Sequence, residues 1–158
     1  MPSRNVSADV NAEASKFVLR QARETDDPML RALLESAKLP FEDVSSERQD
    51  FIVAISEGQV VGCVALETFG AVALLRSLAV ADHLRGDGLG RILYDRIVAR
   101  AKEQGLTRLF LLTMTAAPFF ARRGFESLDR SEAPEVMTKS AQFASLCPST
   151  ATCMALSL

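Results

Sequence analysis

Seven consecutive residues, 85–91, combine three glycines with two arginines in a pattern suited to binding an anion: Arg85, Gly86, Asp87, Gly88, Leu89, Gly90 and Arg91. Glycine lets the backbone turn tightly and lets a ligand approach it closely. If a helix begins here, its first N–H groups have no intrahelical partner and its dipole adds positive potential. The segment therefore predicts a phosphate or pyrophosphate site.

The flanking residues support this prediction. Residues 74–80 form an apolar run typical of a strand, and residues 92–100 have the spacing of an amphipathic helix. A Walker A loop is excluded because no Lys-Ser/Thr pair follows the glycines. A dinucleotide-binding fingerprint has a different glycine spacing and stands at the first turn of a βαβ unit, whereas more than half of this chain comes first.

The rest of the pattern predicts the elements that position this loop. We expect strands at 17–22, 51–56, 60–68, 71–80, 107–113 and 151–158. Helices are expected from a cap at Thr25 to Ala37, from the glycine loop to Gln104, over 116–123 and over 133–144. Residues 1–15 are predicted to form a flexible leader, and 16–158 a single domain.

Composition excludes several classes of function. The 158 residues are 48% hydrophobic and 24% charged, with a net charge of −2, which argues against binding nucleic acid by phosphate neutralisation. No apolar run is long enough for a membrane span, and no signal-peptide core is evident, so a cytoplasmic location is expected. With one histidine, His83, and no zinc-like cysteine spacing, no metal site is predicted.

Two motifs give the chain a resemblance to a known family. Arg85–Gly90 resembles the Arg/Gln-x-x-Gly-x-Gly/Ala signature of the GNAT acyltransferases, and Phe119–Phe125 resembles their aromatic-aromatic-x-x-x-Gly-Phe segment. The resemblance covers roughly residues 16–158. It implies an α/β (α+β) fold: a mixed, mainly antiparallel sheet with flanking helices and a parallel strand pair that splays apart. It also implies that the glycine loop binds the pyrophosphate of acetyl-CoA, that Leu78, Ala79 and Val80 bind its pantetheine, and that Phe120 contacts it.

The resemblance leaves the catalytic groups less defined. Family members often have a tyrosine general acid where this chain has Phe120, and the only tyrosine, Tyr94, suits a packing role better. Thr113 and Cys147 are the alternative proton donors to the departing CoA thiolate, and Thr113 is also expected to contact the substrate. Glu67 is the candidate base, with a solvated position at a hairpin end as the alternative. Arg76 interrupts an apolar strand and needs an anionic partner, which is either a substrate carboxylate or Glu67.

Four segments, 75–80, 111–116, 119–122 and 145–149, look like the small acetyltransferases encoded with bacterial arsenic-resistance genes. This resemblance implies N-acetylation of a small amine-bearing compound, such as a toxic, amino-acid-like one. Cys147 and Cys153 would then be thiolates of interest for arsenic, with buried structural cysteines as the alternative. Two other interpretations stay open: a CoA-binding regulatory module without catalysis, and acetylation of a protein or peptide. Both a monomer and a homodimer fit the sequence.

Overall fold

The computed structural model describes residues 17–42, 44, 49–140, 143 and 150–158. Its seven strands form one sheet in the order β1-β2-β3-β4-β5-β7-β6. The strands are β1 (Val18–Gln21), β2 (Gln49–Ser56), β3 (Gln59–Phe69), β4 (Val72–Val80), β5 (Arg108–Thr113), β6 (Glu126–Leu128) and β7 (Thr152–Ser157). All neighbouring pairs are antiparallel except β4 and β5, which confirms the expected mixed sheet.

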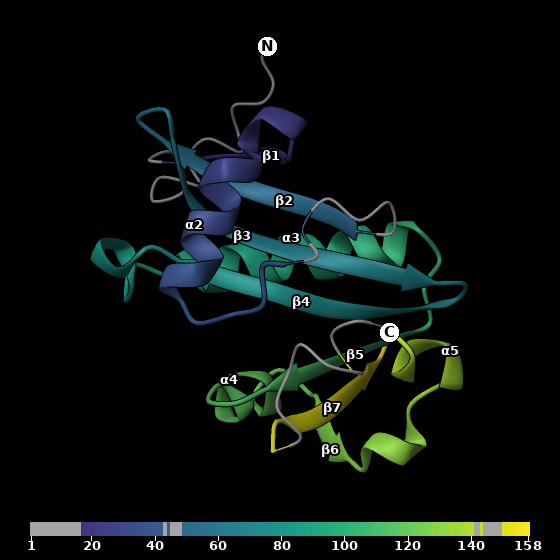
Figure 1. Cartoon of the computed structure of the whole chain (residues 1–158). Coiled ribbons are helices and arrows are strands. Elements are labelled where there is room, and N and C mark those ends of the chain that lie inside the picture. The colour runs from purple at the N-terminus through teal and green to yellow at the C-terminus, as the bar shows by residue number, and fades with distance from the viewer. Residues whose placement is uncertain (1–16, 43, 45–48, 141–142, 144–149) are drawn as a thin grey trace, which may run out of the picture.

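Four α-helices and three 3₁₀ turns are described along the chain. The helices are α2 (Asp27–Ser36), α3 (Leu89–Glu103), α4 (Ala117–Ala121) and α5 (Glu135–Thr138), and the turns are η2 (Glu24–Asp26), η3 (Asp82–Leu84) and η4 (Arg130–Glu132). Helix α2 crosses in front of the sheet in Figure 1 and α3 runs behind it. None of the described helices is long and apolar enough to cross a membrane.

Each face of the central strands is covered by one helix. Leu89, Leu93 and Ile97 of α3 pack with residues of β3 and β4 in one buried cluster. Leu30 and Leu34 of α2 belong to a second cluster on β2 and β3. A third cluster lies around β5 and β7. Burial of these apolar faces holds the helices at fixed positions against the sheet.

The parallel pair is short. Strand β4 pairs with β5 only at Val72–Leu74, opposite Arg108–Phe110, although β4 continues to Val80 and β5 to Thr113. The two strands therefore separate toward their C-terminal ends, as a splayed pair does. The second half of β4 keeps β3 as its partner and leads through the short turn η3 to the glycine loop.

Three expectations about the elements need correction. Thr25 lies inside η2, and α2 begins after Asp26. In the described part of the helix expected at 133–144, α5 ends at Thr138, and Lys139 and Ser140 are not helical. The three-residue β6 was missed, since a strand of this length carries too few residues to show a period. The expected leader, 1–15, lies outside the described residues.

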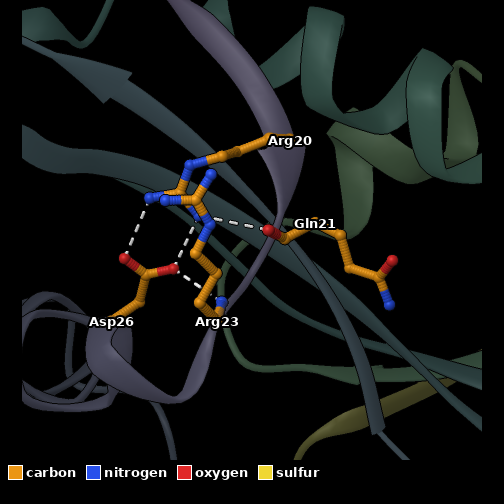
Figure 2. Close-up of polar contacts among 4 residues, drawn as sticks. All are labelled: Arg20, Gln21, Arg23 and Asp26. Atoms are coloured by element: carbon orange, nitrogen blue, oxygen red, sulfur yellow. Dashed lines mark hydrogen bonds and ion pairs between the residues drawn. The ribbon is translucent and has the colours of Figure 1, made fainter.

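A buried carboxylate fixes the first strand to the helix that follows it (Figure 2). Asp26 Oδ2 and Oδ1 accept hydrogen bonds from Arg20 Nη1 at 2.7 Å and Nη2 at 3.0 Å, and Oδ2 also accepts from the backbone N–H of Arg23 at 2.7 Å. The hydrogen bonds from Arg20 hold the pKa of Asp26 below its usual value. This bidentate pair satisfies the charge of an aspartate that is only 3% exposed.

Candidate functional site

Strand β4 carries a β-bulge at the point where it leaves β5. Cys63 pairs with Ala79 and Ala65 pairs with Arg76, so Ser77 and Leu78 together oppose the single residue Val64. Ser77 has a φ of 64°, in the left-handed region that few non-glycine residues adopt. A bulge turns part of the strand backbone out of the ladder. This bulge lies in the part of β4 that no longer pairs with β5.

The glycine loop connects this bulged strand to helix α3. Gly86 and Gly88 have φ values of 90° and 84°, conformations that only glycine adopts readily. Gly88 is the N-cap of α3 and provides no side-chain cap, so the first N–H groups of the helix remain available to a ligand. The strand, glycine turn and helix start that the sequence predicted are therefore present, and binding of an anion at this loop stays a prediction.

A further glycine, which was not predicted to contribute to the site, lets α3 sit close to the sheet. A Cβ at Gly62 in β3 would lie 2.9 Å from Leu93 Cδ1 and 3.0 Å from Leu89 Cδ2. Gly62 therefore allows the first turns of α3 to approach β3, which places the start of the helix beside the end of β4. Gly62 lies inside an apolar run, so its role depends on a tertiary contact that the sequence does not display.

The bulged strand, the glycine loop and α4 line one cavity of about 690 Å³. It brings together nearly all of the residues predicted for the cofactor: Leu78, Ala79, Val80, Arg85, Gly86, Gly88, Leu89, Gly90 and Arg91. It also has lining residues that were not predicted: Ala37, Leu39, Leu84, Thr115, Phe119 and Arg123. Asp87, within the same loop, is exposed. The site is therefore a mixed one, with a cationic, glycine-rich mouth and apolar walls from β4 and α4.

Arg123 is the most informative of the additional residues. Its guanidinium lies 3.6 Å from the centre of the Phe119 ring, and Nη1 donates a hydrogen bond to the Phe119 carbonyl at 2.8 Å. Stacking and hydrogen bonding hold the charge in place at low entropic cost. Together with Arg85 and Arg91 it gives the cavity three guanidinium groups. In the sequence, the only indication of this role was that Arg123 follows shortly after the aromatic pair Phe119 and Phe120.

Phe120 lies beneath the cavity wall in an aromatic cluster. It is 5% exposed, and its ring centre is 5.1 Å from that of Phe119, 5.5 Å from that of Phe125 and 6.2 Å from that of Tyr94. Tyr94 is buried as well, and burial raises the pKa of its hydroxyl. These contacts agree with the packing role expected for Tyr94. They place Phe119 rather than Phe120 at the cavity surface.

Glu67, predicted for catalysis, and Arg76, predicted for the substrate, form a buried ion pair apart from the cavity lining. Arg76 Nη1 lies 3.2 Å from Glu67 Oε1, and the two side chains are 0% and 7% exposed. Two partners were expected for Arg76, a substrate carboxylate or Glu67, and in the structure Arg76 pairs with Glu67. The solvated position considered for Glu67 is wrong, because the register places it opposite Leu74 within the sheet. A buried ion pair of this kind neutralises both charges.

Thr113 ends β5 on the opposite side of the gap. Its Oγ1 accepts a hydrogen bond from the backbone N–H of Ala116 at 2.9 Å, which fixes the turn that leads into α4. Cys153 is a buried, free cysteine, and burial raises the pKa of its thiol. Cys147 lies outside the described residues. Within the described part of the chain, no three His, Cys, Asp or Glu side chains are grouped as metal ligands would be.

The chain is similar to known acetyltransferases in sequence. Residues 47–127, about half of the chain, match the model of the acetyltransferase (GNAT) domain. The chain is 31% identical over 130 residues to an uncharacterized N-acetyltransferase of Chlorobaculum tepidum, covering 77% of this chain and 83% of that protein. It is 33% identical over 122 residues to an amino-acid acetyltransferase of Mycobacterium tuberculosis, covering 71% and 70%.

Among solved structures, the fold is similar to N-acetylglutamate synthase from Neisseria gonorrhoeae complexed with coenzyme A and N-acetyl-glutamate. The TM-score is 0.75 at 27% sequence identity, over 90% of this chain. The chain spans about a third of the length of that synthase, 35%, and 30% of the amino-acid acetyltransferase of Neisseria meningitidis that it also matches.

Proposed function

The chain belongs to the GNAT acetyltransferase family and is an N-acetyltransferase, and from this premise we propose that it transfers the acetyl group of acetyl-CoA to the amine of a small, amino-acid-like substrate. The observation that carries the proposal is the joining of the bulged β4 and the N-terminus of α3 in one cavity. Relatives described as amino-acid acetyltransferases support the acceptor class.

We assign the cationic mouth to the phosphates of acetyl-CoA and the apolar walls to its pantetheine. The N–H groups at Leu89, Gly90 and Arg91 begin α3 and would bind the pyrophosphate, assisted by the guanidinium groups of the loop. Leu78 to Val80 would bind the pantetheine amides as a neighbouring strand does. Residues of these types fit a long ligand with an anionic end and an apolar body.

In this arrangement the acyl carbonyl would lie against the bulge. A backbone N–H of the Leu78–Ala79 segment would donate to its oxygen and stabilise the negative charge that develops during attack by the amine. The donor belongs to a strand held on both sides by packing, so it needs no reorganisation. We place the acceptor beyond this point, where Glu67, Arg76 and Thr113 supply polar groups.

The amine must lose a proton before it can attack, and we propose Glu67 as the base that receives it, through water where the distance requires. Arg76 neutralises Glu67 when the acceptor is absent and would share its charge with an acceptor carboxylate when one is bound. With phenylalanine at 120, the departing thiolate of CoA would take its proton from water or from the ammonium formed by the attack.

The test of this function is release of the CoA thiol from acetyl-CoA in the presence of single amines, with the product identified by mass. The panel pairs each amino acid with its carboxamide, which keeps the amine and removes the negative charge. We expect turnover with amino acids and a tenfold or greater preference over the carboxamides. CoA binding without turnover on any amine would instead support the regulatory module.

Steady-state kinetics of Arg76→Leu test the acceptor carboxylate separately. If Arg76 contacts it, the KM for the amino acid rises and that for acetyl-CoA stays nearly constant, with a loss of about 2–3 kcal/mol in kcat/KM for acceptors that carry a carboxylate. Equal losses for amino acids and carboxamides would show that Arg76 acts only as the partner of Glu67.

Two finer parts of the proposal rest on the sequence. A toxic, amino-acid-like acceptor follows from the resemblance to acetyltransferases of arsenic-resistance clusters, and adding such compounds to the amine panel tests it. A cytoplasmic location follows from the composition, and cell fractionation tests it.

A further inference from the structure

A continuous set of buried polar groups lies beneath the bulge of β4. Cys63 on β3 is 0% exposed, Arg76 2% and Ser77 8%. Cys63 Sγ lies 3.1 Å from the carbonyl oxygen of Ser77, and Arg76 Nε donates to Ser77 Oγ at 3.1 Å. The residue with the strained backbone is therefore held through both its carbonyl and its side chain.

Cys63 is tied to the bulge by its side chain and by its place in the sheet. Its thiol donates to the Ser77 carbonyl, and its backbone lies opposite Ala79 in the register of β3 and β4. Burial raises the pKa of the thiol to about 12, so the proton needed for donation is present at neutral pH. Cys63 is thus linked to the residues immediately before and after Leu78, from the strand that pairs with them.

This geometry explains how Ser77 keeps a φ of 64°. A left-handed conformation costs a non-glycine residue free energy and persists only where the surroundings determine it. Here the cost is offset by hydrogen bonds from groups that are themselves immobile. Losing the thiol would remove the contact that fixes the peptide between Ser77 and Leu78, and the direction of its N–H would then vary.

We propose that Cys63 is a positioning residue that fixes the bulge of β4 and so aims the backbone N–H of Leu78 at the acyl carbonyl. This inference rests on the proposed function, in which the Leu78–Ala79 segment polarises the thioester. Cys63 takes no part in the chemistry itself: it is fully buried and acts through Ser77 and Ala79. A merely packed cysteine would lose stability on truncation without a specific loss of turnover.

The matched pair of variants is Cys63→Ala and Cys153→Ala. Both remove a buried thiol from the sheet, but Cys153 lies on β7, paired with Leu112 and Leu128, away from the bulge. We expect Cys63→Ala to lower kcat about tenfold, with the KM for acetyl-CoA within twofold of the wild type, because misdirecting one donor weakens transition-state stabilisation. Cys153→Ala should keep the wild-type kcat. Equal losses in both variants would overturn the proposal.

A conservative substitution separates positioning from packing. Cys63→Ser keeps a buried donor opposite the Ser77 carbonyl, whereas Cys63→Ala removes it. We expect the kcat of Cys63→Ser to stay within about threefold of the wild type, compared with the tenfold loss in Cys63→Ala. A tenfold loss in both variants would contradict the role given to the thiol.

Amide hydrogen exchange provides a readout that needs no acceptor. We expect the Ala79 amide to exchange at least about tenfold faster in Cys63→Ala and unchanged in Cys153→Ala. Unchanged exchange at Ala79 in Cys63→Ala would overturn the inference whether or not an acceptor has been found. Failure of the wild-type enzyme to turn over any amine would instead count against the proposed function.

Discussion

Replacing Gly88 by valine tests the anion cradle against a matched control elsewhere in the chain. Gly88 has a φ of 84° at the start of α3, and Gly58 has a φ of 76° in the turn between β2 and β3. Neither position is sterically closed: a Cβ at Gly88 would lie 3.8 Å from Arg91 Nη2, and one at Gly58 would meet nothing within 4 Å. The two substitutions therefore impose similar backbone strain at different places.

The strain should cost each variant about 1–2 kcal/mol of unfolding free energy, the usual price of a left-handed conformation for a residue with a Cβ. The effect on the affinity for CoA should differ between the two variants. In Gly88→Val a branched side chain stands where the pyrophosphate would approach, and the turn that aligns the helix N–H groups relaxes. Losing two charge-assisted hydrogen bonds at about 1.5 kcal/mol each weakens binding more than 100-fold.

Isothermal titration of CoA into the wild type and both variants measures this difference, and urea denaturation measures the shared loss of stability. We expect Gly58→Val to bind CoA with wild-type affinity and Gly88→Val to bind too weakly to titrate. Wild-type affinity in Gly88→Val, or equal loss in both variants, would refute the cradle.

Three further predictions concern other parts of the structure. Asp26→Asn should lose about 2–3 kcal/mol at pH 7, measured by urea denaturation, because it breaks the bidentate pair with Arg20. Since the folded-state pKa of Asp26 is lowered, this difference should be complete above the unfolded value of about 3.9 and shrink as pH falls through the folded value; a difference that stays constant as the pH is lowered would contradict it. Phe120→Tyr should change kcat by no more than a few-fold, whereas a hundredfold gain, about 2.7 kcal/mol, would show that a leaving-group acid was limiting. Arg123→Leu should weaken CoA binding about tenfold while Arg122→Leu, which alters the neighbouring exposed arginine, does not; equal effects would place Arg123 outside the site.

The sequence predicted the parts of the site that are contiguous in the chain. Residues 78–80 and most of 85–91 line the cavity, and local spacing was enough to indicate them, because a strand, a glycine turn and a helix start are short-range features. The order of strands and helices along the chain also predicted the sheet and its parallel pair.

Contacts between distant segments could not be predicted in this way. The bulge at Ser77 arises from the register between β3 and β4, and the close approach at Gly62 depends on side chains of α3. Glu67 was one of the two partners expected for Arg76, but its burial, in place of a solvated position at the hairpin end, became visible only once the strands were paired. Arg123 acquired its place through stacking on Phe119, which depends on the fold of α4.

A crystal structure of the protein with CoA tests the central claim most directly. We expect the pyrophosphate at the N–H groups that begin α3, the pantetheine alongside Leu78–Val80, and the thiol at the bulge near Ser77. CoA bound outside the cavity between β4 and α4, or a thiol end turned away from the bulge, would contradict the account.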